Sequence, residues 1–154
     1  MNIPVTTILA SLLATVFLVL SLRVIRLRME KKVAHGDGGD EELRRAIRGH
    51  ANCAEYAPIG ILLMLIAELQ SVNIILLAIL AAAFMLGRLF HAYAFGFTAG
   101  NVFLRVRGMQ LTFFTIAILA VLNIAILVYA WIGPTRTLRM LISLLPETIP
   151  PIRF

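Results

Sequence analysis

Three polar residues in the first half of the chain have the spacing of one helical face. Arg48, Asn52 and Glu55 lie at i, i+4 and i+7 in the segment RGHANCAEYAP, which continues directly into the apolar run IGILLMLIA. On an α-helix these positions form a single stripe. A charged side chain inside a membrane helix costs at least about 2.5 kcal/mol at the bilayer centre, so it persists where it faces protein, water or a ligand. The stripe therefore predicts a polar site inside a membrane protein.

A second polar stripe lies further along the chain. Arg88 and His91 are spaced i, i+3 in the third apolar segment, and Arg26 and Arg105 border the first and the fourth. Arginine binds carboxylates through paired hydrogen bonds. Glu55 is the one acid expected to reach inward beside these cations, where it could hold an ammonium or an amide donor. The set predicts a pocket for a zwitterionic ligand that carries carboxylates and an ammonium.

Simpler structural roles stay open for several of these residues. Glu55 could pair with an arginine of a neighbouring helix, a role compatible with ligand binding. Cys53, the single cysteine, is expected to be a small packing residue, and the histidines lack metal-ligand spacing, so no metal site is predicted. Because the sequence has no acyl-transfer triad, phosphate loop or carboxylate dyad, an enzyme of this kind would use a nucleophile carried by a bound molecule. An arginine beside a thiol would stabilise the thiolate.

The elements that must position these residues are membrane-spanning helices. Of the 154 residues, 60% are hydrophobic and 14% are charged, about half the charged share of a soluble domain. Segments able to cross a hydrocarbon core of roughly 30 Å are expected at residues 3–28, 41–69, 72–96 and 105–132. We expect residues 1–154 to form one all-α membrane domain, a four-helix transmembrane bundle. Its tail, residues 133–154, is expected to hold a short interfacial helix.

Capping and turn residues indicate where the expected helices begin and bend. The segment GDGG at 36–39 interrupts the first helix, and Asp40 is suited to cap the second. Pro58 falls inside the second helix, where it removes a backbone hydrogen bond and is expected to kink the chain beside the polar stripe. Glu68, near the far end of that helix, is expected at the membrane interface.

The net charge of +6 is concentrated around the first and third loops. By the positive-inside rule, these loops are expected to face the cytoplasm of a multi-pass protein in a bacterial inner membrane. Arg44 and Arg45 are expected to contact lipid head groups. Topology and an anionic ligand explain the basic excess, so no nucleic-acid partner is predicted.

The polar motifs resemble those of a known family, the membrane-associated proteins in eicosanoid and glutathione metabolism. RGHANCAEYAP is similar to its helix-two signature of Arg, then Asn four residues on, Glu three further and a following Pro. Arg88-x-x-His91 resembles the helix-three motif of the prostaglandin synthase branch, and Arg105 followed by Gly108 looks like the start of its fourth helix. The first loop is similar to that of small bacterial members.

The resemblance implies a four-helix protomer, a homotrimer and glutathione bound between neighbouring protomers near the cytoplasmic face. Glutathione would be the co-substrate, with no metal. Arg105 would stabilise the thiolate or the developing charge as it attacks a lipophilic electrophile, with Arg107 as a rival for this role. The residues implied to bind the tripeptide are Arg26, Arg48, His50, Asn52, Glu55, Tyr56, Arg88 and His91.

The resemblance implies a membrane-bound glutathione transferase, with glutathione peroxidase activity as a second expected activity. Its partners would be further copies of the chain, membrane lipids and the electrophile. Phe95 stands where eicosanoid-forming members often have a Tyr, which favours general detoxification over specialised eicosanoid synthesis. Two alternatives stay open: a non-catalytic lipid- or glutathione-binding scaffold on the same fold, and a small four-helix exporter with Glu55 as its proton-coupled carboxylate.

Overall fold

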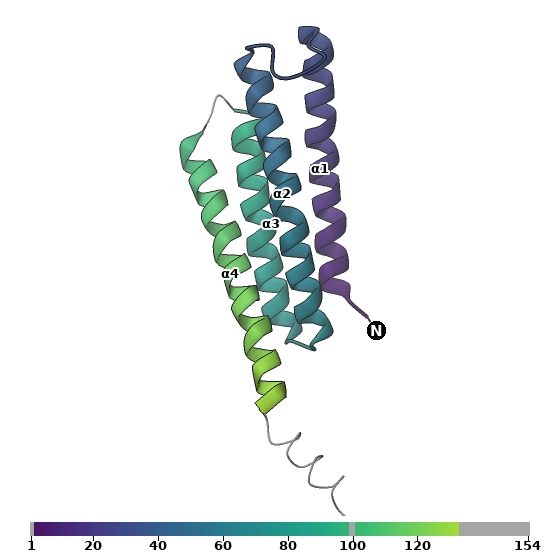
Figure 1. The fold of residues 1–154 in the computed structure, drawn as a ribbon, viewed down its shortest axis with the longest axis vertical. Coiled ribbons are helices and arrows are strands. Elements are labelled where there is room, and N and C mark those ends of the chain that lie inside the picture. Colours follow the sequence, from purple (N-terminus) through teal and green to yellow (C-terminus); the bar gives the residue numbers. More distant parts are fainter. Residues whose placement is uncertain (1, 99–100, 133–154) are drawn as a thin grey trace, which may run out of the picture.

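Four long α-helices make up the structure, a computed structural model that describes residues 2–98 and 101–132. They are α1 (Pro4–Lys31), α2 (Glu41–Leu69), α3 (Ile74–Gly96) and α4 (Val102–Ile132). All four are long and apolar enough to cross a membrane, and the described residues contain no strand. The predicted all-α, four-helix architecture is confirmed. The α1–α2 loop, the last turn of α3 and the first turn of α4 share one end of the bundle, called here the loop end (Figure 1).

The helix boundaries differ from the predicted ones by a few residues. α1 continues to Lys31, and Lys32 closes it in the left-handed region with φ of 56°. α4 begins at Val102, just after Asn101, whose side chain accepts a hydrogen bond of 3.0 Å from the Leu104 backbone N–H. The predicted cap of α2 is present, because Asp40 accepts a hydrogen bond of 2.8 Å from the backbone of residue 43. The interfacial helix predicted for 133–154 lies outside the described residues.

The two middle helices form the centre of the bundle. α2 and α3 each contact the other three helices, whereas α1 and α4 lie on opposite sides and make no contact within the described residues. α2 stays one continuous helix through Pro58. This arrangement creates two separate junctions, one between α1, α2 and α3 and one between α2, α3 and α4.

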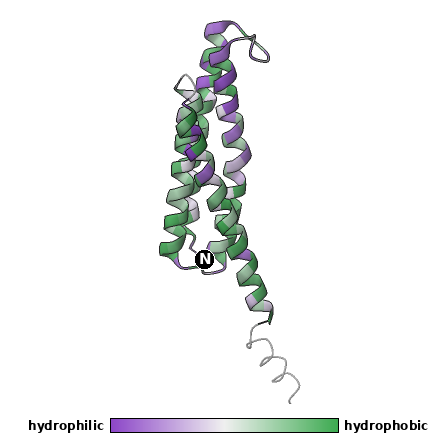
Figure 2. Cartoon of the chain, turned by 90° about the vertical axis from the view of Figure 1, so that its left-hand side faces the viewer, coloured by the Kyte–Doolittle hydropathy of each residue, from purple (hydrophilic) through white to green (hydrophobic). Residues whose placement is uncertain are grey.

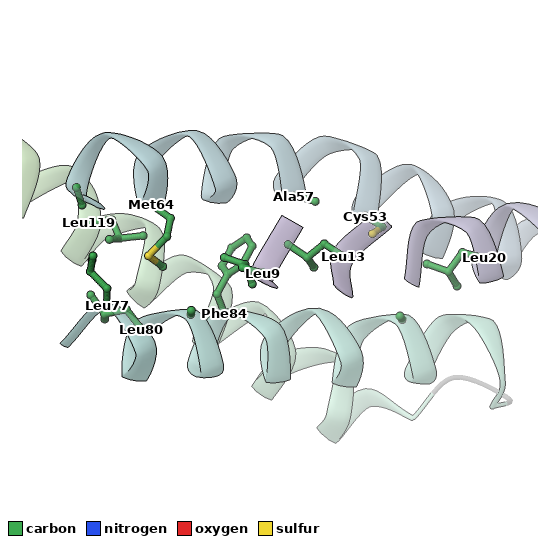
Figure 3. Close-up of a cluster of buried hydrophobic side chains, with 13 residues drawn as sticks. Leu9, Leu13, Leu20, Cys53, Ala57, Met64, Leu77, Leu80, Phe84 and Leu119 are labelled. Atoms are coloured by element: carbon green, nitrogen blue, oxygen red, sulfur yellow. The ribbon is translucent and has the colours of Figure 1, made fainter. Parts of the chain in front are cut away.

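The core between the helices is a cluster of buried apolar side chains. Leu13 of α1, Met64 of α2 and Phe84 of α3 are all at most 1% exposed, and their side chains point between the helices (Figure 3). The Phe84 ring packs directly on Gly60 of α2, where even a Cβ would collide with it. Large apolar residues also cover the outside, such as Ile8 and Val121, which are more than 60% exposed. Hydrophilic residues gather toward the loop end (Figure 2), as expected for a bundle in lipid.

Glu68 has a specific structural role that the sequence did not reveal. Its two carboxylate oxygens accept hydrogen bonds of 2.9 Å and 2.7 Å from the backbone N–H groups of Val5 and Thr6. These are among the N–H groups at the start of α1 that have no partner inside the helix, and the negative charge also suits the positive end of the helix dipole. The last turn of α2 therefore caps the first turn of α1.

Candidate functional site

Arg88 of α3 is the centre of the polar cluster. Its side chain is fully buried (0% exposed), and its Nη2 donates a hydrogen bond of 2.6 Å to Oδ1 of Asn52 on α2. Within residues 2–98 and 101–132, Arg88 forms no ion pair, and its Nε and Nη1 have no hydrogen-bond partner. A buried cation with unused donors is unfavourable. Nε and Nη1 of Arg88 are therefore donors for which the described chain supplies no acceptor.

Aromatic and sulfur-containing side chains surround this arginine. The Tyr56 ring centroid lies 5.6 Å from Cζ of Arg88 and 5.6 Å from the ring of Phe113 on α4. The amide of Asn52 also approaches Sδ of Met109 on α4, at 4.0 Å. The cluster therefore lies at the junction of α2, α3 and α4, and Tyr56 faces this helix boundary.

His91 extends the cluster by one helical turn toward the loop end. It is 4% exposed, and its ring packs on Phe95 with centroids 4.8 Å apart. Its Nδ1 has no hydrogen-bond partner in the described part of the chain. The guanidinium of Arg105 lies over the same Phe95 ring, with Cζ 5.6 Å from the centroid. The Phe95 ring therefore lies between His91 of α3 and Arg105 of α4.

Two glycines let α4 approach α3 closely enough to place Arg105. A Cβ added at Gly108 would lie 2.7 Å from the carbonyl oxygen of Gly87 and 2.8 Å from the backbone nitrogen of His91. A Cβ added at Gly87 would lie 2.9 Å from the carbonyl oxygen of Gly108. Such distances are too short for real side chains, so the helix contact depends on both glycines. Arg105 stands three residues before Gly108, and this contact sets its position over the Phe95 ring.

Arg48 and Glu55 lie next to the cluster but face outward. Both side chains are exposed, and neither forms an ion pair among the described residues. Glu55 stands about 21 Å along α2 from its first residue at 1.5 Å per residue, which places it near mid-helix. A bare carboxylate facing lipid at that depth is unfavourable.

Arg26 and His50 lie away from this cluster in the described chain. Nε of Arg26 pairs with Oε1 of Glu30 at 2.6 Å, and the Arg26 side chain is 80% exposed. The His50 ring packs instead on Phe17 of α1, with centroids 4.7 Å apart. The reason is the helical repeat, because His50 is two residues from Asn52 and therefore on another face of α2. Arg26 belongs to α1, which does not touch α4.

Sequence reasoning missed the contributions of α4 other than its arginines. Met109 and Phe113 follow Arg105 at i+4 and i+8, so the periodicity alone could have placed them on the same face. The rival Arg107 points elsewhere, donating to Oε1 of Gln110 at 3.2 Å and lying over another ring, that of residue 103. No group of three potential metal-binding side chains occurs in the described ranges.

Comparison with known proteins assigns the chain to a family. A family model for the MAPEG family matches residues 6–125, which include every residue of the cluster. The chain belongs to the MAPEG family. Two relatives, both named inner membrane protein YecN, come from Escherichia coli strain K12 and Escherichia coli O6:H1. Each is 43% identical over 91 residues, which is 59% of this chain and 70% of the relative.

Membership in the MAPEG family indicates that the four apolar helices lie in a membrane. This MAPEG protein is an integral, multi-pass membrane protein of four helices. Arg88 and Asn52 form the buried part of its polar cluster and Tyr56 is half-buried beside them, whereas Arg48, Glu55 and Arg105 are exposed.

Proposed function

We propose that this MAPEG protein is a glutathione transferase of a bacterial inner membrane, the location named for its relatives. The observation that carries the proposal is the buried guanidinium of Arg88. It is fixed on one side by Asn52 and has two nitrogen atoms without a partner among the described residues. Glutathione carries two carboxylates, which match unused arginine donors. Its ammonium group matches Glu55, which has no ion pair in the described protomer.

The proposed reaction uses the thiol of glutathione as the nucleophile. Arg105 would stabilise the thiolate, since a nearby cation favours the ionised form. The sulfur then attacks an electrophilic carbon of an apolar acceptor from the bilayer, and the acceptor's leaving group departs with the bonding electrons. The proton of the thiol goes to water. Arg88, Arg48 and Glu55 would bind the tripeptide and would not take part in the bond changes.

A homotrimer supports this function by closing the open side of the site. Glu55 and Arg48 are exposed on a membrane-spanning helix of the single protomer, an arrangement that is costly against lipid. A neighbouring copy covering this face would bury both groups. Arg26, which is remote from the cluster within one protomer, would then contribute to the site of an adjacent copy.

The deciding experiment is calorimetric titration of glutathione into the detergent-solubilised protein. We expect saturable heat of binding. Glu55→Gln should weaken the binding at least tenfold, because a tenfold loss of affinity equals about 1.4 kcal/mol and a hydrogen bond to a charged group contributes about that much or more. Glu41→Gln is the matched control, because it removes an exposed acid from the first turn of the same helix. No heat at millimolar glutathione would refute the proposal.

A parallel assay measures conjugation of glutathione to an aryl halide by the same preparation. Turnover would support the transferase. Saturable glutathione binding without turnover or thiolate absorbance would refute it in favour of the non-catalytic scaffold.

A further inference from the structure

A polar cavity of about 250 Å³ lies at the loop end, between α1, α2 and α3. Its lining includes Arg23 of α1, Glu42 and Arg45 of α2, and residues 95–98 at the end of α3. The Arg88 cluster lies instead at the junction of α2, α3 and α4, and the Phe95 ring on which His91 packs borders both. None of the residues assigned above to glutathione contributes to the described lining of this cavity.

The cavity has an excess of positive charge and an unused donor. Nη2 of Arg23 pairs with Oε1 of Glu42 at 3.1 Å, and its Cζ lies 4.7 Å from the ring centroid of Phe97. Nε of the same arginine is buried and has no hydrogen-bond partner in the part of the chain that the structure describes. Among the described residues, Arg45 pairs only with Glu41, at 4.0 Å. Two guanidinium groups therefore share the cavity with one carboxylate.

An apolar groove of about 250 Å³ lies next to this cavity, between α1 and α3. Val16 and Val19 line it from α1, Leu89 and Ala92 line it from α3, and Phe97 lines both the groove and the cavity. On α1 the groove reaches back to residue 15, eight residues before Arg23 of the cavity. Eight residues of α-helix correspond to about 12 Å along the helix axis. One leaflet of the hydrocarbon core is about 15 Å thick. A second apolar hollow of about 350 Å³ lies further along the same two helices.

We infer that the cavity and the groove together bind one phospholipid with an anionic head group. The phosphate accepts hydrogen bonds from Arg23 and Arg45, and an acyl chain lies along the groove between α1 and α3. A basic pocket beside a membrane helix is suited to such a head group, and the apolar lining of the groove is suited to an acyl chain of the same leaflet. A soluble phosphate would use only the cavity and would leave the groove without a role.

Native mass spectrometry of the purified full-length protein tests this inference. The probes are phosphatidylglycerol and phosphatidylcholine with identical acyl chains, with soluble glycerol phosphate as the head group alone. We expect phosphatidylglycerol to be retained in preference to phosphatidylcholine. Arg45→Gln should weaken this retention about fivefold, the equivalent of about 1 kcal/mol for one basic residue near an anionic lipid.

Two further variants separate the site from general charge attraction. Arg44→Gln removes a neighbouring exposed arginine that pairs with Asp37 and Glu41 and should leave retention unchanged. Val19→Trp fills the groove from a residue that is 47% exposed, and should reduce retention without unfolding the bundle. Equal retention of the two lipids, equal losses in Arg44→Gln and Arg45→Gln, full retention in Val19→Trp, or displacement by glycerol phosphate would each overturn the inference. The glutathione titration is a separate readout, so either proposal can fail alone.

Discussion

Asn52 Oδ1 and Arg88 Nη2 lie 2.6 Å apart and join the two central helices inside the bundle. The bond spans 36 residues of sequence and fixes a guanidinium that is otherwise buried among apolar and aromatic side chains. Removing a buried charge together with its need for partners is often neutral or stabilising, whereas removing only the partner is destabilising. This asymmetry separates the structural role of Arg88 from its proposed role in binding.

Arg88→Met should therefore abolish glutathione binding while it leaves the melting temperature of the solubilised protein unchanged or higher. Methionine fills a similar volume and needs no hydrogen bonds, so removal of the buried charge offsets the loss of the donor to Oδ1 of Asn52. Asn52→Leu should instead lower the stability by about 1–3 kcal/mol, because it leaves the buried arginine without its acceptor. Thermal unfolding and calorimetry of both variants check this pair. A large loss of stability in Arg88→Met would mean that the arginine serves the fold.

Arg105→Ala should reduce the turnover number of the conjugation reaction by about 100-fold, the scale of losing one charge-stabilising donor. Glutathione affinity should change much less, because the arginine acts on the thiolate. Steady-state kinetics and calorimetry measure the two effects. Arg107→Ala is the matched control, because its side chain faces Gln110 and another ring. Similar losses in both arginine variants would contradict the assignment.

Glu68→Gln should destabilise the protein by about 0.5–2 kcal/mol, the usual effect of losing a helix cap. The variant keeps one acceptor oxygen but loses the charge and the second oxygen that receive the N–H groups of Val5 and Thr6. Hydrogen exchange should rise in the first turn of α1, and glutathione binding should stay the same. Glu30→Gln removes only an exposed ion pair with Arg26 and should have little effect. Unchanged exchange in the first turn would argue against the cap.

Gly108→Ala should destabilise the bundle by about 1–3 kcal/mol, the usual cost of overpacking. The new Cβ would meet the backbone of Gly87 and His91, so α4 must move away from α3 and carry Arg105 with it. Conjugation activity should fall together with stability. Val106→Ala, at a 46% exposed position of the same helix, supplies the comparison. A fully active and stable Gly108→Ala protein would show that the helices do not depend on this close contact.

The pH dependence of stability should include a contribution from Asp40. The hydrogen bond from Lys31, with Nζ 2.8 Å from Oδ2, and then that from the Leu43 backbone N–H, hold the pKa of Asp40 below its ordinary value. A lowered pKa stabilises the fold above the ordinary value of about 3.9, and this stabilisation is lost as the pH falls through the lower folded value.

Asp40→Asn measures this contribution because asparagine also caps helices well. The melting temperature of the variant should lie below that of the original protein by a constant amount from pH 7 to about pH 5. The difference should shrink below about pH 4. A difference that persists unchanged in acid would exclude the ion pair as its cause.

The sequence by itself determined the fold class and the type of site. Four apolar runs of sufficient length predict a helical bundle, because each helix satisfies its own backbone hydrogen bonds in lipid. Local rules alone placed Asp40 at the N-cap of α2 and Pro58 inside that helix. The spacing of Arg48, Asn52 and Glu55 along one helix was enough to indicate a polar site, because polar residues are expensive there.

Only the tertiary structure decided which of those residues meet. The side chain of Arg88 could face any neighbour until the packing of α2 against α3 directed it to Asn52. The contact at Gly108 directed Arg105 to the Phe95 ring. His50 belongs to the same motif as Asn52, yet the helical repeat turns it toward Phe17. Arg26 has the charge expected at the site, but it belongs to α1, which does not contact α4. Spacing along a chain sets the face of one helix, whereas contacts between helices depend on the relative rotation and depth of two, and side-chain volumes in the shared core determine both.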